Sequence, residues 1–480
     1  MPGERAGLRV TPLRFIRFAT VCCFVLVFAA GIFATAAWQP AIAPINPPLA
    51  TSFAPDVVKR GAELAAIGDC AVCHTAPAGR IFAGGRAIAT PFGTIYSTNI
   101  TPDAETGIGT WSEAAFQRAL RNGVARDGSY LYPAFPYDHF TLVSDDDDKA
   151  LYAFLMTRTP VQAPALTNDL PFPLKVRPVL YGWNLLFLRR GPYRADPAHD
   201  EAWNRGAYLV DGLGHCGDCH TPRNLFGAEQ RDRRFAGGAA EGWTAYALDA
   251  ASPAPVPWTA EALTQYLGRG FAAQHGVPRG PMADIASDLR SVPADDIRAI
   301  AIYVAAQMGS HGPERTQIAQ QVVTQNARGT LVVGNSADSQ ADTFHLAAPD
   351  GEGALIYLGA CAGCHQGPRA MPYGGIDLSL SSTVSAPSAD NFINVVLYGL
   401  PAAEAAHAPI MPGFANAMND SQVAALARYV RAHFTDQAPW SGIEKNVTAT
   451  RSAARAATVD HGPPSGLPGT SQRTTHEAQR

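Results

Sequence analysis

The sequence predicts an all-α protein with three tandem domains behind an N-terminal apolar segment. Its 480 residues are enough for about three domains of ~150 residues each. A repeat of this size is present, because a cysteine pair recurs at intervals of 146 and 145 residues, beginning at Cys70, Cys216 and Cys361. Each repeat carries a helix-forming stretch before its cysteine pair and an amphipathic helical pattern at its end.

The charge balance limits the classes of partner. Lysine and arginine number 37 against 41 aspartates and glutamates, which gives a net charge of −4. A protein that binds nucleic acid through its phosphates would carry a basic surplus. We therefore expect no nucleic-acid partner.

The first element along the chain is the uncharged stretch of 21 residues Phe18–Trp38. As a helix it would rise about 31 Å, which is enough to cross a bilayer. Because this run is longer than the apolar region of a typical signal peptide, residues 1–38 are predicted to be a membrane anchor. The basic residues before it predict that the N-terminus lies in the cytoplasm and the rest of the chain on the periplasmic side of the cytoplasmic membrane. The alternative is a cleaved signal peptide, because A-x-A-like sites occur at 34–36 and 41–43. The basic residues are Arg5, Arg9, Arg14 and Arg17.

Each of the three cysteine pairs is a C-x-x-C sequence followed at once by a histidine. This pattern is typical of covalent c-type haem attachment. Two thiols three residues apart can bond the two vinyl groups of one porphyrin, and the adjacent imidazole then reaches the iron. A zinc site would need four ligands, so two distant motifs would have to meet and one would be left over. A redox cysteine pair does not need the histidine. The sequence thus predicts three covalent haem c groups, held by Cys70, Cys73 and His74, by Cys216, Cys219 and His220, and by Cys361, Cys364 and His365.

The first domain is expected at residues 56–160. It begins with a helix around Arg60–Leu64 and has a middle helix that Ser112 caps at its N-terminus. The last helix is expected at Lys149–Met156, after the acidic run Asp145–Asp148, which suits the positive end of a helix dipole.

The second and third domains, expected at 201–310 and 349–436, repeat this order. Each has a helix before its haem motif, a long loop, and a late amphipathic helix opened by polar or acidic residues. This order resembles the small all-α cytochrome c domain. The expected helices lie around Arg205–Leu209, after the N-cap Thr259, at Ile297–Met308, around Glu352–Ile356 and at Val423–Phe434.

The segments between and after the domains are rich in proline or in small residues. Residues 39–55 hold five prolines and predict a semi-rigid linker. The connector 161–200 contains the apolar run Leu180–Leu188, which is too short to span a membrane. It is either a strap packed on the haem domains or an exposed patch for a partner or a quinone. A spacer is expected at 311–348, and the tail 437–480 is expected to be disordered because it has few large apolar residues.

Methionines in two of the repeats stand where a sixth iron ligand is expected. Met282 lies 62 residues after His220, and Met411 lies 46 residues after His365, each just before the last helix of its repeat. A methionine ligand raises the reduction potential of the iron. His407 is a weaker rival for Met411.

The first repeat departs from this pattern. Phe135 stands 61 residues after His74, where the other repeats suggest a ligand, and phenylalanine cannot bind iron. Three outcomes remain open: His139 is the ligand, Met156 is the ligand, or the first iron has no sixth protein ligand. His139 is preferred because it lies on the same loop, and two histidine ligands would make this haem the lowest in potential.

With the three motifs and the loop Tyr132–Phe140, the chain resembles the triple-haem cytochrome c subunits of bacterial membrane-bound dehydrogenases over roughly residues 55–435. In relatives that serve quinoprotein alcohol dehydrogenases and flavin gluconate or sorbitol dehydrogenases, this loop usually reads Tyr-Pro-Ala-Met-Pro-Tyr. Here Phe135 replaces the methionine. The version Tyr-Pro-Ala-Phe-Pro-Tyr-Asp-His-Phe is similar to the branch that partners molybdenum hydroxylases, including an aldehyde dehydrogenase.

This resemblance implies an electron carrier rather than a catalytic chain. A separate molybdopterin subunit, working with an iron–sulfur subunit, would oxidise an aldehyde, and the electrons would pass through this chain to ubiquinone. One alternative is the cytochrome subunit of a pyrroloquinoline quinone alcohol dehydrogenase or of a flavin gluconate or sorbitol dehydrogenase. Another is a haem peroxidase that uses an open first haem, since a vacant iron position can bind peroxide.

Overall fold

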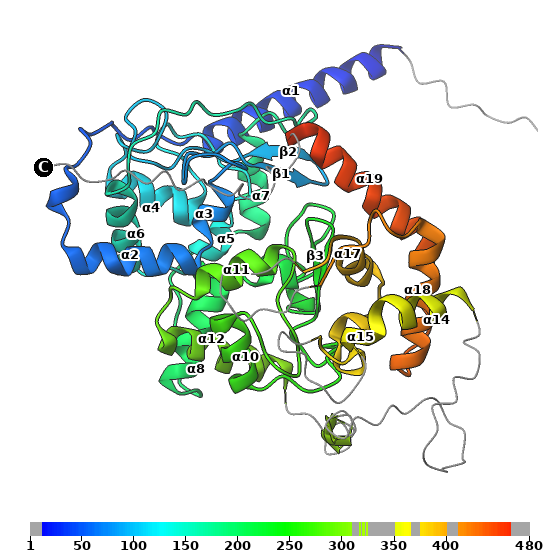
Figure 1. Cartoon of the computed structure of the whole chain (residues 1–480). Helices are drawn as coiled ribbons and strands as arrows, with labels where there is room; N and C mark the ends of the chain where they lie inside the picture. The colour runs from blue at the N-terminus through cyan, green and yellow to red at the C-terminus, as the bar shows by residue number, and fades with distance from the viewer. Residues whose placement is uncertain are drawn as a thin grey trace, which may run out of the picture.

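The computed structural model of the chain describes residues 12–309, 316–324 except 318 and 322, 351–365, 375–400 and 411–461. Helices make up most of the regular structure in these ranges (Figure 1), so the helix-rich class is confirmed. Most of the expected spacer 311–348 lies outside the described residues, as do Arg5, Arg9 and His407.

The helices of the first repeat begin at the predicted capping residues. Ser112 caps α4, because its side chain accepts a hydrogen bond from the backbone N–H of Ala115. Ser144 caps the last helix in the same way. This helix begins at Asp145, four residues before the expected start at Lys149, so the acidic run forms its first turn. The helices are α2 (Pro55–Ile67), α3 (Cys70–Cys73), α4 (Glu113–Asn122), α5 (Tyr137–Phe140) and α6 (Asp145–Met156), preceded by the short turn η1 (Ala50–Ser52).

The second and third repeats have the same order of elements. Thr259 caps the middle helix of the second repeat, as expected, and Asn419 forms a capping box with Gln422 at the last helix of the third. The second repeat contains α8 (Glu201–Tyr208), η2 (Leu209–Leu213), α9 (Gly217–His220), η3 (Arg231–Arg233), α10 (Ala260–Arg269), α11 (Pro281–Leu289) and α12 (Ala294–Met308). The third contains α14 (Glu352–Ile356), η4 (Tyr357–Cys361), α15 (Ala362–His365), η5 (Leu378–Leu380), α16 (Ser382–Ser385), α17 (Asp390–Tyr398) and α18 (Asp420–Phe434).

A glycine lies where the first and last helices of each repeat cross. A Cβ atom at this position would overlap a backbone carbonyl oxygen of the last helix, so only glycine allows the two backbones to come this close. The same crossing therefore occurs three times along the chain. The distance from the Cβ position to the oxygen would be 1.9 Å for Gly61 on Ala150, 2.0 Å for Gly206 on Ala299 and 2.2 Å for Gly353 on Ala425.

Two short antiparallel hairpins correct the all-α prediction. Strand β1 (Ala87–Thr90) pairs with β2 (Gly93–Tyr96), and β3 (Gly238–Ala240) pairs with β4 (Trp243–Ala245). Both lie in the long loop after a cysteine motif. These four segments are three or four residues long, which is too short to produce a readable alternation of apolar and polar residues.

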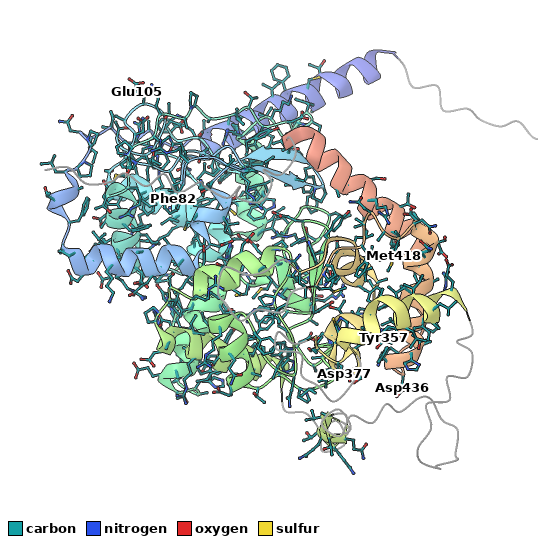
Figure 2. The ribbon with its side chains drawn as sticks, in the orientation of Figure 1. Phe82, Glu105, Tyr357, Asp377, Met418 and Asp436 are labelled. Atoms are coloured by element: carbon teal, nitrogen blue, oxygen red, sulfur yellow. The ribbon has the colours of Figure 1, made fainter. Side chains whose placement is uncertain are left out.

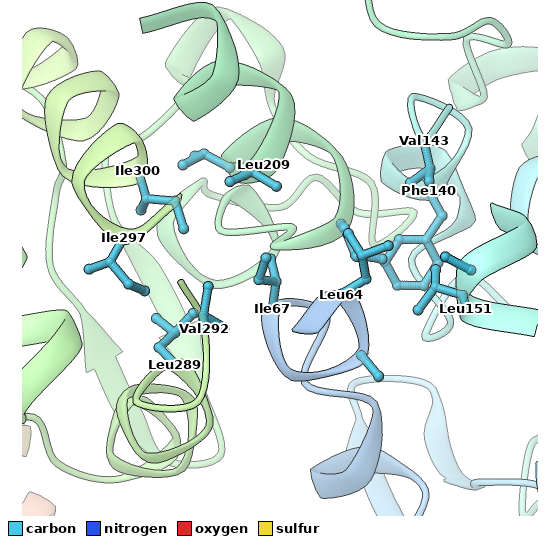
Figure 3. Packing of buried hydrophobic residues seen from close by; sticks show 14 of the residues in the cluster. Leu64, Ile67, Phe140, Val143, Leu151, Leu209, Leu289, Val292, Ile297 and Ile300 are labelled. Atoms are coloured by element: carbon cyan, nitrogen blue, oxygen red, sulfur yellow. The ribbon is translucent and has the colours of Figure 1, made fainter. Parts of the chain in front are cut away.

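The described buried apolar residues form two main cores rather than one for each repeat. Leu64, Ile67 and Leu151 of the first repeat share one core with Leu209 and Ile297 of the second (Figure 3). A second core lies within the third repeat around the buried Tyr357, which is labelled with Met418 in Figure 2. The first two repeats are therefore joined by continuous apolar packing.

Polar contacts attach the third repeat to the second. The backbone N–H of Thr244 in β4 donates to the side-chain oxygen of Asn391 in α17 at 2.9 Å. The Asn391 amide donates back to the Thr244 carbonyl at 2.8 Å. Arg279 also donates to the carbonyl oxygen of Gly399 at 2.6 Å.

The tail is not wholly disordered, which corrects the prediction for residues 437–480. Helix α19 (Ile443–His461) packs on α17 and α18, and the side chains of Ile443 and Val447 are buried. Arg451 pairs with Asp420 at 2.7 Å. Composition alone missed this helix because two or three well-placed apolar residues are enough to attach it to an existing core.

Helix α1 (Pro12–Ala37) contains most of the predicted anchor, and its described apolar side chains are largely exposed. Among the residues that the structure describes, no helix has the combined length and hydropathy that crossing a bilayer requires. The connector contributes α7 (Val179–Phe187), which lies beside the end of α1 (Figure 1), with the rings of Phe33 and Tyr181 5.7 Å apart.

Candidate haem sites

The cysteine pairs lie at equivalent places in the three repeats. In the first, α3 follows α2 directly and carries Cys70 and Cys73. In the second and third, a π-helical turn leads from the first helix into the motif. All six motif cysteines are free of disulfide bonds, so both sulfurs of each pair are available to one porphyrin. They are Cys70, Cys73, Cys216, Cys219, Cys361 and Cys364.

Burial favours the protonated thiol in the motif cysteines of the first two repeats and in Cys361. It raises the pKa of Cys70 and Cys216 to about 12, and that of Cys361 to about 11. Redox-active and zinc-binding cysteines have depressed pKa values because the thiolate is the reactive form. These five cysteines therefore lie in environments unlike those of a reactive thiol.

The three motif histidines share one hydrogen bond that orients the ring. In each, Nδ1 donates to a backbone carbonyl oxygen of the following long loop, which leaves the lone pair of Nε2 for a metal. Burial also lowers the pKa of His74 and His220, which favours the neutral ring that binds iron. The distances are 2.7 Å from His74 to Thr98, 2.6 Å from His220 to Tyr246 and 2.8 Å from His365 to Ile376.

One continuous cavity of about 1390 Å³ reaches all three motifs. It is larger than a typical pocket for one small ligand, which measures about 300–1,000 Å³. The predicted ligands Met282 and Met411 line it together with the motifs of their own repeats. The structure thus places both methionines at the cavity where the iron ligands are expected. The motif residues in its wall are Cys73, Cys216, Cys219, His220, Cys361, Cys364 and His365.

Several residues in the cavity wall have buried polar atoms without a hydrogen-bond partner in the described part of the chain, among them His275 and Tyr357. Both ring nitrogens of His275 are unpaired although the residue is only 9% exposed, and the ring stacks on Trp258 at 3.6 Å. The hydroxyl of Tyr357 is also unpaired. Orphaned polar atoms are costly unless a bound group satisfies them. Together with the free thiols and the oriented histidines, they fit a porphyrin with polar substituents.

Sequence patterns alone do not indicate that His275 belongs to the site. It lies seven residues before Met282 on a loop with no recognisable motif. Its place at the cavity follows from the fold of that loop against Trp258.

The alternatives for the first iron are not equivalent in the structure. Phe135 packs into the core, with its ring 5.3 Å from that of Phe140. Met156 lies at the end of α6 and is 3% exposed, inside the same core. Tyr132, Pro133 and Ala134 of the loop line the cavity, whereas neither Phe135 nor Met156 is part of its wall.

His139 points to the second repeat, and both of its ring nitrogens have partners there; its role as a ligand of the first iron stays a prediction. Its Nδ1 donates to the carbonyl oxygen of Asp211 at 2.7 Å, and Nε2 lies 3.0 Å from the Glu229 carboxylate and 3.6 Å from that of Asp218. Burial alone lowers the pKa of this histidine, but the hydrogen bond to Glu229 and the charges of Asp218 and Asp138 raise it to about 10. A charged ring with both nitrogens engaged has no lone pair for a metal.

Comparison with known proteins places the chain among cytochromes. Residues 348–430 match the family model described as cytochrome c oxidase, cbb3-type, subunit III. The chain is 37% identical over 406 residues to the fructose dehydrogenase cytochrome subunit of Gluconobacter japonicus, with 82% of each chain covered. It is 36% identical to the gluconate 2-dehydrogenase cytochrome c subunit of Pantoea cypripedii, covering 82% of this chain and 89% of that one.

A further relative is much longer than this chain. A nicotinate dehydrogenase subunit of Pseudomonas putida is 45% identical over 428 residues, which are 88% of this chain. The match covers only 34% of that protein, so the chain spans about a third of its length.

Proposed function

Because the chain belongs to the family of cytochrome c subunits of dehydrogenase complexes, we propose that it holds three haem c groups in series and passes electrons from a catalytic subunit to ubiquinone. The observation that carries this proposal is the single cavity that touches all three cysteine motifs. The cavity borders Cys73 of the first motif and all three haem-binding residues of the second and third, which supports electron exchange between neighbouring sites within this chain.

The protein's own residues supply attachment, orientation and a dry environment. The cysteines of each motif would hold one porphyrin, and the histidine that follows them would bind its iron through Nε2. Haem contributes reversible one-electron chemistry, and the protein tunes the potential through the axial ligands and burial. Met282 and Met411 would give the second and third sites higher potentials than the first, where no methionine lines the cavity. The first haem would then have the lowest reduction potential, so electrons from the catalytic subunit would enter at the first repeat and pass on to the haems of higher potential.

For the catalytic partner we propose a molybdopterin aldehyde dehydrogenase with an iron–sulfur subunit. The loop Tyr132–Phe140 supports this choice, because Phe135 replaces the methionine that is usual in the alcohol and gluconate branch. The 45% identity to a protein named for nicotinate favours a second candidate, a complex that oxidises a heteroaromatic acid.

For the location we propose the periplasmic face of the cytoplasmic membrane, with the N-terminus in the cytoplasm. The arginines before Phe18 support this orientation, and the exposed apolar side chains of α1 support contact with lipid. Haem c attachment also takes place on this side of the membrane.

Purification of the native complex tests the proposal. The denatured chain should retain covalent haem, with a mass that corresponds to three groups, and the complex should contain molybdenum. Fewer than three haems would contradict the three-site relay. Finding pyrroloquinoline quinone or flavin without molybdenum would instead reject the proposed partner and leave the relay in place.

A peroxidase activity at the first haem is a second candidate, and the engagement of His139 with Asp211 and Glu229 is the observation that favours it. A reduced sample treated with carbon monoxide separates the two functions. A marked spectral shift from one haem in three, together with peroxide turnover, would support the peroxidase. A shift without turnover would leave a carrier whose first iron lacks a sixth protein ligand.

A further inference from the structure

The connector exposes an unusual group of large apolar side chains, here called the α7 patch. Five of them come from the connector and two from a loop of the second repeat. Leu186 is 70% exposed, Phe172 84% and Leu225 92%. Soluble surfaces rarely gather this many apolar side chains unless they bind something apolar. The patch consists of Phe172, Val176, Val179, Leu185, Leu186, Leu225 and Phe226.

The two parts of the α7 patch are held together by direct contacts. The indole N–H of Trp183 donates to the carbonyl oxygen of Phe226 at 3.1 Å, and the rings of Phe187 and Phe226 lie 6.0 Å apart. Arg231 donates to the carbonyl oxygen of Phe187. These contacts hold α7 against the loop that carries Leu225 and Phe226.

The opposite face of α7 is attached to the first repeat. Leu180 and Asn184 are buried, and the Asn184 side chain accepts a hydrogen bond from the hydroxyl of Tyr137 at 2.7 Å. The helix is thus a strap on one face and an exposed surface on the other. Because the inner face is fixed, Leu185 is held outward, and Leu186 is 70% exposed beside the opening of the cavity.

The chain around the patch is strongly basic. Between Leu170 and Asp196 there are five basic residues and no acidic one. Of the five, all but Arg177 are exposed. Apolar side chains bordered by basic ones are typical of surfaces that lie in the headgroup region of anionic membranes. The five are Lys175, Arg177, Arg189, Arg190 and Arg194.

The patch also continues the surface of α1. Ala37 at the end of α1 and Leu180 of α7 lie in the same small apolar cluster, and Phe33 contacts Tyr181. Phe24 and Phe28 of α1 are more than 70% exposed. Two neighbouring helices thus offer apolar side chains to the solvent.

We propose that the α7 patch inserts into the surface of an anionic phospholipid bilayer, with its apolar side chains among the acyl chains and its basic residues at the phosphates. This inference rests on the proposed membrane location and adds a second point of contact to α1. Leu186 and Phe226 also line the cavity that reaches the cysteine motifs. The same contact therefore gives an apolar electron acceptor a route from the lipid to the cavity.

Site-directed spin labelling of the full chain tests the inference. Single cysteines replace Leu185, Leu225, Phe28 of α1 and, as a water-exposed control, Asp146, whose side chain is 96% exposed. The background carries Cys22→Ala and Cys23→Ala, and the motif cysteines are blocked by haem. In nanodiscs of phosphatidylcholine and phosphatidylglycerol, oxygen and a water-soluble nickel chelate compete as relaxation agents. Labels at 185 and 225 should collide mainly with oxygen, like the label at 28, whereas the label at 146 should collide mainly with nickel.

The outcomes separate this inference from the proposed location. If labels 185 and 225 behave like 146 while 28 lies in lipid, the inference is overturned and the membrane location stands. If all four labels are in water, both are overturned. If 185 and 225 become inaccessible to both agents only when the catalytic subunits are present, a protein covers the patch and the inference is overturned.

As a second variant, Arg189→Gln with Arg190→Gln should make the labels at 185 and 225 shallower in anionic nanodiscs and leave label 28 unchanged. Equal depth with and without the arginines would reject the role assigned to the phosphates.

Discussion

The ion pair between His139 and Glu229 should make the stability of the first two repeats depend on pH. The pKa of this histidine is about 10 in the folded chain, against an ordinary value of 6.5. The stabilisation is therefore fully present below pH 6.5 and is lost as the pH rises towards 10. At 1.36 kcal/mol for each pKa unit, the interval corresponds to about 5 kcal/mol. The residue is well buried, with its side chain 12% exposed, so solvent screening reduces this figure little.

Urea unfolding, followed by circular dichroism between pH 6 and 10, measures this effect. The variant His139→Gln cannot acquire the charge, so its stability should change much less over this interval than that of the unmodified chain. Glu229→Gln is the matched partner variant, and it should flatten the profile only in part, because the charges of Asp218 and Asp138 remain beside the histidine. The first two repeats share one core and should unfold together, which gives a single transition to compare.

Two results would refute this reasoning. Equal pH profiles for His139→Gln and the unmodified chain would show that the histidine is not the titrating group. Conversion of the first haem to a carbon monoxide-binding form in His139→Ala, from a form that did not bind it, would show that the histidine binds iron after all.

Three further predictions concern the haem sites and the helix crossings. Phe135→Met should place a ligand on the first loop, which would raise the lowest reduction potential and reduce carbon monoxide binding. An unchanged redox titration would mean that this loop does not face the iron. Met282→Ala and Met411→Ala should each lower the reduction potential of one haem and open its iron to carbon monoxide. A variant with an unaltered spectrum would exclude that methionine as a ligand. Gly206→Ala should destabilise the second repeat by about 1–3 kcal/mol, because its Cβ would overlap a carbonyl oxygen, as measured by the urea midpoint; wild-type stability would show that the helices separate at no cost.

Local sequence patterns predicted the helices well because caps and amphipathic repeats act over a few residues. Ser112 and Thr259 cap the helices that they were expected to cap. The acidic run Asp145–Asp148 lies in the first turn of α6, where it suits the helix dipole. Helix caps and first-turn charges depend only on residues nearby in the sequence, so they could be predicted without knowledge of the fold.

The partner of His139 could not be predicted in this way. The sequence shows that His139 lies on the loop of the first repeat where a ligand is expected. It does not show that Glu229, which is 90 residues away in another repeat, lies beside the ring. The same is true of His275, whose role at the cavity depends on its packing against Trp258. Such contacts form only when distant segments pack together.

The chemistry of the chain can be read from its residues without the fold: three thiol pairs, each with its own histidine, recur at nearly equal intervals. The structure was needed to show that the first two repeats share one core, that β3–β4 attaches the third, and that one cavity reaches all three motifs. This division reflects the range of the interactions. Covalent attachment, capping and helix periodicity are encoded within a few residues, whereas burial and ion pairing depend on which surfaces meet after the chain has folded.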